Sequence, residues 1–448
     1  MKRLFGTRGI RGPISTKVTP ELMLKLGMAL AEKTDGGKVV VGRDARTSGE
    51  MLLRTFTAGL LAGGSDVVEL GIVPSPCLAF TTRSLGASAG AIITASHNPP
   101  PDNGVAFYHG DGREFTSEDE IEMEKLVLDK QPQLASWESI GRIQSCNAIV
   151  PYIEAIKSQV KVEQQVKVVV DCANGAASQV TPVLLRELGC RVVTINSHHD
   201  GHFPGRAPEP QPWNLKDLMQ VVKDVRADIG IAHDGDADRV AAVDEKGNFI
   251  KHDALIAIFA EEAVRRNHGG VVVTSVNTSV AIEEVVDRAG GKTVRTGLGR
   301  FTEEMFKHGA CFAGEPGKLV FLEFGSWADG ILGAAKLVEL VASAGKPISE
   351  IFRERIPDYP MFHQDLKCPD DRKREFMTKM KGYLLEKITD VRDVLEVDGV
   401  RIHRRDGSWV LARVSGTEPK ARVMAEAKSK EGLEELRSIL LEGVKRYL

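Results

Sequence analysis

The sequence predicts an α/β protein in which three similar domains built from βαβ units precede a smaller α+β domain. Three segments of the 448-residue chain repeat one plan: a run of β-branched residues, a helix-length stretch, and a second such run. The paired runs start 28, 24 and 22 residues apart, at Val39 and Val67, Val168 and Val192, and Val271 and Thr293. This spacing suits a helix that links two parallel strands. Because the valine runs do not alternate with polar residues, we expect strands buried on both faces.

The same units could instead form one large doubly wound sheet. Proline-rich breaks at 204–212 and 357–369 divide the chain, and they favour separate domains. The last part of the chain departs from the repeat, because two helix-like stretches enclose short strands. Helices are expected at 370–387 and 431–447, and strands at 400–403, 408–414 and 421–425. This pattern is typical of a small α+β domain.

Composition excludes several classes of partner. Hydrophobic residues make up 42% and charged residues 27%, as in ordinary globular proteins. The net charge is -3 and no long basic run occurs, so we expect neither nucleic acid nor a membrane surface as partner. Six scattered cysteines form no CxxC pair, no signal segment opens the chain, and no apolar run reaches membrane-spanning length. We therefore expect a cytoplasmic protein, and its oligomeric state is not indicated.

A serine follows a buried strand that is expected at 91–93. It lies in the sequence TASHNPP, which spans Thr94 to Pro100. Ligands gather at the strand ends of open α/β sheets, and Ser96 could serve there as a covalent nucleophile. The alternative is a proline-terminated turn in which the polar side chains cap the backbone.

Three carboxylates at alternate positions follow another predicted strand, in the sequence DIGIAHDGDADR. From an extended loop, Asp234, Asp236 and Asp238 can converge on one hard cation, and oxygen-only ligands suit Mg²⁺. Arg239 adds a planar donor for a phosphate. With Glu245 the carboxylates also match an EF-hand, but Arg239 stands where that loop needs glycine. An aspartyl-phosphate enzyme with Asp234 as nucleophile and a purely structural acidic turn remain alternatives.

Three further motifs could contact an anionic sugar. The sequence RVSGTEPKAR at 413–422 offers backbone N–H groups and hydroxyls between two arginines, which suits a phosphate, or it is a plain charged hairpin. Glu315, in GEPGK, could accept hydrogen bonds from sugar hydroxyls, although a plain turn is favoured for this motif alone. The glycine-rich opening FGTRGIRG could present Arg11 to a phosphate or form an ordinary loop.

Together, these motifs resemble the α-D-phosphohexomutase family over nearly the whole chain. The Ser96, Asp234 and Arg413 loops match the family's active-serine, metal-binding and phosphate-binding loops in the family's order. The segments 5–12, 42–48, 71–76 and 200–210 are also similar to the family. The family includes phosphoglucosamine mutases, phosphomannomutases and phosphoglucomutases.

The resemblance implies four domains around a central cleft. We place them at 1–150 with the active serine, 151–252 with the metal loop, 253–365 with the sugar loop and 366–448 with the phosphate loop. It also implies Mg²⁺ held by a phosphorylated Ser96 with Asp234, Asp236 and Asp238, and a sugar 1,6-bisphosphate as activator. The implied catalytic residues are Ser96, His97 and Arg11. The implied substrate-binding residues are Arg239, Glu315, Lys318, Arg413, Ser415, Gly416, Thr417 and Arg422.

Three departures from the family pattern affect the sugar and the proton transfer. Ala106 stands where many members carry an acid/base lysine, and Gly317 stands where the sugar loop usually has Ser or Asn. The loop at 297–300 reads GLGR rather than the usual pattern. Either the substrate is unusual or another group, such as Lys318 or His109, supplies the proton. Lys318 could equally be a solvated loop charge.

The sequence therefore predicts a phosphosugar mutase that interconverts sugar 1-phosphate and sugar 6-phosphate through a phosphoserine and a bisphosphorylated intermediate. The Phe-Gly-Thr opening leans slightly towards phosphoglucosamine mutase among the family's activities. The alternatives are a phosphopentomutase of the same family, an aspartyl-phosphate phosphatase, and a phosphosugar-binding paralogue without turnover. The sugar and the phosphorylation state of Ser96 are not determined by the sequence.

Overall fold

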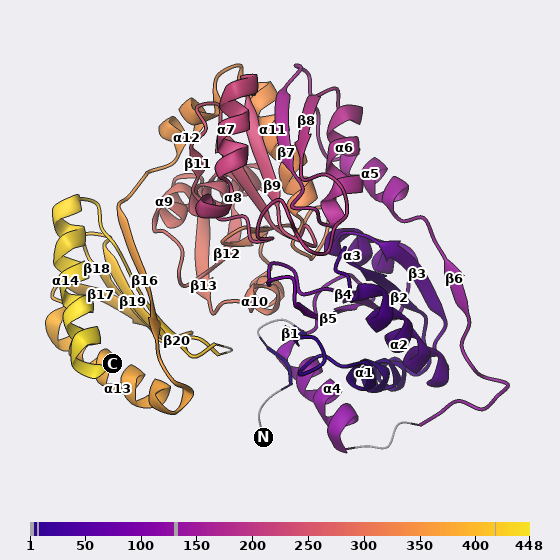
Figure 1. Ribbon diagram of the computed structural model, residues 1–448. Helices are drawn as coiled ribbons and strands as arrows, with labels where there is room; N and C mark the ends of the chain where they lie inside the picture. Colours follow the sequence, from indigo (N-terminus) through magenta and orange to yellow (C-terminus); the bar gives the residue numbers. More distant parts are fainter. Residues whose placement is uncertain (1–3, 7–8, 130–132, 417) are drawn as a thin grey trace. The chain divides into compact units, whose positions relative to one another are not determined.

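The computed structural model describes residues 4–6, 9–129, 133–416 and 418–448 (Figure 1). The chain divides into two compact units, one formed by 1–252 with 317–351 and the other by 253–316 with 352–448.

The first sheet of unit 1 has the strand order β1-β5-β4-β2-β3-β6. The β2–β3, β2–β4 and β3–β6 pairs are parallel, whereas β1–β5 and β4–β5 are antiparallel. The strands are β1 (Ile10–Pro13), β2 (Val39–Arg43), β3 (Val67–Ile72), β4 (Ala89–Ile93), β5 (Asp102–His109) and β6 (Ile143–Ser145). The helices are α1 (Pro20–Lys33), α2 (Gly49–Ala62), α3 (Ser75–Ser84) and α4 (Ser117–Asp129). Helices α1 and α2 pack closely because Gly27 and Gly59 face the partner backbone, where a Cβ would lie 2.2 Å from a carbonyl oxygen.

The second sheet of unit 1 has the order β11-β10-β9-β7-β8. Strands β7, β8 and β9 are parallel, and β9 joins β10 as an antiparallel pair. The strands are β7 (Lys167–Asp171), β8 (Arg191–Ile195), β9 (Ile229–His233), β10 (Val240–Asp244) and β11 (Phe249–Ile250). The helices are α5 (Ile149–Lys157), α6 (Thr181–Glu187) and α7 (Lys216–Val225), with 3₁₀ turns at Ala176–Gln179 and Pro212–Asn214. Unit 1 also contains β15 (Lys318–Phe321) and α11 (Gly330–Ala344).

Unit 2 begins with three parallel strands in the order β13-β12-β14. They are β12 (Gly270–Ser275), β13 (Gly291–Thr296) and β14 (Phe312–Glu315). The associated helices are α8 (His252–Arg266), α9 (Ala281–Arg288), α10 (Phe301–Lys307) and α12 (Ile348–Arg355). The strand-helix-strand units that the valine runs predicted are thus confirmed in all three places, since β2–β3, β7–β8 and β12–β13 are parallel neighbours.

The C-terminal part of unit 2 is an antiparallel sheet in the order β16-β20-β19-β18-β17 (Figure 1). Its strands are β16 (Met361–Lys367), β17 (Val391–Leu395), β18 (Val400–Arg404), β19 (Trp409–Val414) and β20 (Lys420–Glu426), with α13 (Lys373–Lys387) and α14 (Lys430–Tyr447). Phe376, Met380, Leu436 and Leu440 pack these helices onto Ile402 and Val410, while Trp409, Leu411 and Met424 join a second cluster with Val276 and Val280. Successive residues of β19 therefore join clusters on opposite faces of the sheet, and this strand is buried on both faces.

The predicted fold class is confirmed, with three mixed α/β domains and a smaller α+β domain. The single-sheet alternative is wrong, because the described strands form separate sheets. In the C-terminal domain two strands were missed: the proline-rich break at 357–369 contains the edge strand β16, and β17 follows the predicted helix. Both are edge strands in which no residue is fully buried, so their hydrophobic signal is weak. Within the described residues, no helix is long and apolar enough to cross a membrane, and all six cysteines are free thiols.

Candidate functional site

Ser96 lies on the loop after β4, and its side chain is fully buried. Its Oγ donates a hydrogen bond of 2.6 Å to Oδ2 of Asp234, and Nδ1 of His97 lies 3.3 Å from the same Oγ. The backbone of Ser96 is left-handed, with φ of 51°, a conformation that residues other than glycine adopt uncommonly. The serine hydroxyl therefore faces the acidic loop that the sequence predicts for a metal.

His97 is surrounded by cations. Burial and the positive charges of Arg239, Arg11 and Lys318 hold the pKa of His97 well below its ordinary value. Arg11 reaches this region from β1, where it pairs with Gly104 of β5. His97 is therefore neutral near pH 7, and the positive charge near Ser96 comes from groups suited to a phosphate dianion.

The three carboxylates occupy the turn between β9 and β10. Asp234, Asp236 and Asp238 are buried, and one carboxylate oxygen of each lies within 4.8 Å of the others. Burial and the two neighbouring carboxylates raise the pKa of Asp234 well above its ordinary value. Oδ1 of Asp236 has no hydrogen-bond partner among the described residues, and such a buried oxygen is stabilised by a cation. This donor set fits a hard cation such as Mg²⁺, and the strands on both sides exclude an EF-hand.

Lys318 belongs to this acidic cluster. Its Nζ lies 3.2 Å from Oδ2 of Asp238, and only 6% of its side chain is exposed. The backbone holds it there, because the N–H of Val240 donates to the carbonyl of Gly317 at 2.8 Å and Arg239 forms a β-bridge with Lys318. The expectation that Lys318 could be a solvated loop charge is therefore wrong. A residue 80 positions away in the chain supplies the ion pair, which sequence spacing does not reveal.

Three other side chains around the acidic loop were missed by sequence reasoning. Ser75, the first residue of α3, donates from Oγ to Oδ2 of Asp236 at 2.6 Å. Glu209 lies with Oε1 3.7 Å from Nη1 of the predicted Arg239, whose Nε is 4.0 Å from Oδ2 of Asp234. The third is Arg46, which contacts the serine loop. Their segments had been noted only as similar to a family, and no local pattern reveals these contacts.

The register of β4 and β5 shows how far His109 lies from Ser96, and so whether His109 can replace the acid/base lysine that is absent at Ala106. Ala106 is buried on β5 opposite Ile92, close to the end of β4 that leads to Ser96. His109 lies opposite Ala89, at the other end of β4, and its Nε2 is 2.7 Å from Asp119. Four strand positions separate the two ends, about 13 Å at roughly 3.3 Å per residue. The register therefore disfavours His109 as the proton-transfer group.

Glu315 is the last residue of β14, in unit 2. Its Oε2 accepts a hydrogen bond of 3.0 Å from the N–H of Gly299, so it contacts the loop at 297–300 whose sequence departs from the family. The same loop contacts the C-terminal domain, because the N–H of Leu298 donates to Oδ2 of Asp398 at 3.3 Å. Asp398 in turn lies 2.9 Å from Nη2 of Arg413. One chain of contacts thus joins the predicted sugar loop to the predicted phosphate loop.

The predicted phosphate loop connects β19 and β20, where Arg413 and Arg422 are directly opposite. Arg422 is paired with Glu418 at 2.9 Å and with Asp365 at 3.2 Å. Ser415 is buried and its Oγ accepts a hydrogen bond from the N–H of Glu418, whereas Gly416 has open space around it. Thr417 lies outside the described residues. The arginines are therefore neutralised by carboxylates, with which a substrate phosphate would compete.

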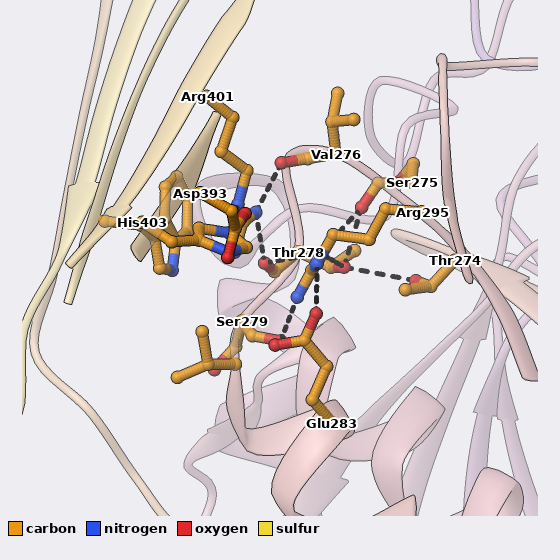
Figure 2. A network of polar contacts seen from close by, with 12 residues as sticks. Thr274, Ser275, Val276, Thr278, Ser279, Glu283, Arg295, Asp393, Arg401 and His403 are labelled. Carbon is orange, nitrogen blue, oxygen red and sulfur yellow. Dashed lines mark hydrogen bonds and ion pairs between the residues drawn. The ribbon is translucent and has the colours of Figure 1, made fainter. Parts of the chain in front are cut away.

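A buried polar network joins the loop after β12 to Arg401 of the C-terminal sheet (Figure 2). Nη1 of Arg401 donates to the carbonyls of Val276 and Thr278, and its guanidinium lies over the Trp409 ring at 3.7 Å. The N–H groups of Arg295 donate to the carbonyls of Ser275, Thr278 and Ser279, and its Nε lies 2.7 Å from Glu283. Two arginines thus tie the loop after β12 to β13 and to the C-terminal sheet.

Comparison with known proteins identifies all four domains. Models of the phosphoglucomutase/phosphomannomutase family match in order along the chain: α/β/α domain I at residues 2–133, domain II at 150–247, domain III at 251–359 and the C-terminal domain at 367–442.

Relatives match the chain from end to end. A protein of Thermococcus kodakarensis named "Phosphopentomutase" is 44% identical, covering 100% of this chain and 98% of its own. A "Probable phosphoglucosamine mutase" of Methanopyrus kandleri is 43% identical with the same coverage. The crystal structure of a phosphoglucomutase/phosphomannomutase family protein from Burkholderia thailandensis has a TM-score of 0.90 at 28% identity, covering 100% of this chain and 98% of that one. The chain therefore belongs to the phosphoglucomutase/phosphomannomutase family and, as the sequence predicted, is a mutase of the isomerase class.

Proposed function

We propose that this mutase carries its phosphoryl group on Ser96 and interconverts a sugar 1-phosphate and a sugar 6-phosphate through a bisphosphorylated sugar. The observation that carries the proposal is the 2.6 Å hydrogen bond from Oγ of Ser96 to Asp234, within a cluster of three buried carboxylates. A serine hydroxyl directed at such a cluster suits a phosphoryl carrier, since a phosphate on that oxygen would meet a cation held by the carboxylates.

The residues around Ser96 take separate roles in this proposal. Asp234, Asp236 and Asp238 would hold Mg²⁺ together with the phosphate on Ser96, and the ion would neutralise charge on the transferring oxygens. His97 contacts the nucleophilic oxygen in its neutral form; while the hydroxyl donates its one hydrogen to Asp234, Nδ1 of His97 can donate to Oγ. Arg11 adds a fixed positive charge near His97.

The remaining sites would bind the sugar and the phosphate that is not reacting. Glu315 would accept hydrogen bonds from sugar hydroxyls, and Arg239 would donate to a phosphate beside the metal. The second phosphate would be held by Arg413, Ser415, Gly416, Thr417 and Arg422. Ser96 first transfers its phosphoryl group to the sugar monophosphate, which becomes a bisphosphate. The bisphosphate then reorients, and the phosphoryl group at its other position is transferred to Ser96. A sugar 1,6-bisphosphate would therefore activate the dephosphorylated enzyme.

The direct test is to follow phosphate on Ser96. Incubation with glucose 1,6-bisphosphate should add one phosphoryl group, which peptide mass spectrometry should locate on Ser96. An acid-labile acyl phosphate on Asp234 would support the phosphatase alternative instead. If the protein binds phosphosugars but no phosphoryl group is transferred, the paralogue without turnover is correct.

The sugar requires a separate assay, because the relatives' names differ while their identities to this chain are nearly equal at 44% and 43%. We favour a hexose or hexosamine phosphate, with a pentose phosphate as the alternative. Turnover of the 1-phosphates of glucosamine, mannose, glucose and ribose, compared by kcat/KM, discriminates between them. We also propose a cytoplasmic location, which the six free thiols support.

A further inference from the structure

Arg46 has no role in the function proposed above, yet it makes an unusually complete set of contacts. It lies three residues after β2, and its side chain is fully buried. All five N–H groups of a guanidinium can donate, and those of Arg46 have five acceptors. Nε donates to Oδ2 of Asp44 at 3.1 Å. The other donors reach four backbone carbonyls of the serine loop: Ser96 at 2.9 Å, Asn98 at 2.6 Å, Pro99 at 2.8 Å and Asp102 at 2.8 Å.

A second line of contacts connects the same guanidinium to the N–H side of Ser96. Oδ2 of Asp44 accepts a hydrogen bond from Oγ1 of Thr94 at 2.6 Å, and Oδ1 accepts one from the N–H of Arg46 at 3.0 Å. Oγ1 of Thr94 accepts the N–H of Ser96 at 2.8 Å. All of these side chains are buried. We define Arg46, Asp44 and Thr94 as the Arg46 clamp, which holds both the N–H and the carbonyl of Ser96.

The clamp acts on a backbone that needs support. Ser96 has φ of 51°, and a residue other than glycine persists in this region only where its surroundings over-determine it. The Ser96 carbonyl also lies against Gly235, where a Cβ would come within 2.6 Å of the oxygen. The position of Oγ relative to Asp234 thus depends on how this peptide group is held. Arg46 binds the carbonyl of that group, and its hydrogen bonds are to Asp44 and to backbone carbonyls rather than to Oγ.

We propose that Arg46 is a positioning residue for phosphoryl transfer: the Arg46 clamp holds Ser96 in the left-handed conformation that directs its Oγ at the metal-binding carboxylates. This inference rests on the proposed role of Ser96 as phosphoryl carrier. Lysine cannot replace Arg46, because an ammonium has three donors on a flexible stem and cannot reach five acceptors in a planar array. The contacts of the clamp are with the serine loop, so we expect it to act on the chemical step.

The test compares Arg46→Lys and Arg46→Gln with the wild type in single-turnover transfer from glucose 1,6-bisphosphate to Ser96, read by intact-protein mass spectrometry. A displacement of about 1 Å at the reacting group can cost about 100-fold in rate. We therefore expect a loss of about 100-fold in the transfer rate and in kcat, with KM changed by less than about threefold. Added guanidinium ion should partly restore an Arg46→Ala variant, because it can refill the vacated site.

Arg295→Lys is the matched control. Arg295 is also buried and also donates to backbone carbonyls of a loop that follows a strand, but it lies in unit 2 and its hydrogen bonds are to residues between 275 and 283 (Figure 2). Arg295→Lys should lower the thermal stability of the protein as an Arg46 variant does, while single-turnover transfer to Ser96 stays within about threefold of wild type. A drop of the same size in Arg295→Lys would overturn the inference, since the effect would then follow from lost stability.

The outcomes separate this inference from the proposed function. If the wild type takes up no phosphate on Ser96, the proposed function and this inference both fail. If the wild type is phosphorylated and folded Arg46→Lys transfers at the wild-type rate, only the inference fails. Should the Arg46 variants not fold, Thr94→Val decides, because it removes the hydroxyl between Ser96 and Asp44 and leaves the guanidinium in place. Slowed transfer in folded Thr94→Val supports the clamp, and an unchanged rate overturns it.

Discussion

Removing the divalent cation should destabilise unit 1, because the three carboxylates lie together in a buried turn. Two unit charges 4.8 Å apart repel by about 3.5 kcal/mol at an effective dielectric constant of about 20. Lys318 and Arg239 offset only part of three negative charges, at 3.2 Å from Asp238 and 4.0 Å from Asp234. A ligand at 100 times its Kd stabilises the state it binds by about 2.7 kcal/mol. At about 2 °C per kcal/mol for a unit of this size, Mg²⁺ should raise Tm by about 5 °C.

The pH dependence follows from the raised pKa of Asp234. Between its ordinary value of 3.8 and the higher value in the folded protein, the native state binds more protons than the unfolded state. The metal-free protein should therefore lose stability as the pH rises through this window. Metal binding requires ionised carboxylates, so the Mg²⁺-induced increase in Tm should be larger at pH 8 than at pH 5.5.

Differential scanning fluorimetry in chelator and in excess Mg²⁺, at both pH values, measures these shifts. Asp236→Asn should raise the Tm of the metal-free protein, because it removes one repelling charge, and should reduce the Mg²⁺ shift to below about 1 °C. Asp224→Asn is the control, since Asp224 is exposed on α7 and hydrogen-bonded to Gln220. An undiminished Mg²⁺ shift in Asp236→Asn, or a shift that shrinks as pH rises, would refute the assigned metal site.

Three kinetic predictions follow from the same geometry. Ser96→Ala should lower kcat to the limit of detection and leave Tm within a few degrees, because it removes one oxygen; wild-type turnover would exclude the phosphoserine. Arg422→Ala should raise KM and weaken bisphosphate binding by about 10-fold, the low end for a charge-assisted pair. The effect should be at that low end because Arg422 is partly exposed and already paired with carboxylates. Binding isotherms that match the wild type would contradict the role of the predicted phosphate loop. Lys318→Met should lower kcat by about 10²-fold or more with a smaller rise in KM if Lys318 moves the proton, and a kcat within twofold of wild type would eliminate it.

Much of the fold could be predicted because its signals are local. Valine runs that do not alternate with polar residues indicate strands buried on both faces. All three valines of β2 and of β7 are buried, and two of the three valines of β12 are buried. The polar edge strands β16 and β17 carry little hydrophobic pattern, so only their pairing with β20 and β18 defines them. The motif at Asp234 could likewise be recognised locally, because clustered carboxylates repel one another and so favour a cation as partner.

Residue types and their spacing identify the chemical groups that this protein brings to its site: a serine after a buried strand, three alternating carboxylates and an arginine-flanked loop. The tertiary structure establishes which of them meet. It pairs Lys318 with Asp238, places His109 at the far end of β4 from Ser96, and surrounds Arg46 with the carbonyls of the serine loop. The physical reason is that side-chain contacts depend on strand register and on the packing of segments far apart in the chain, which residue types and spacing do not encode locally.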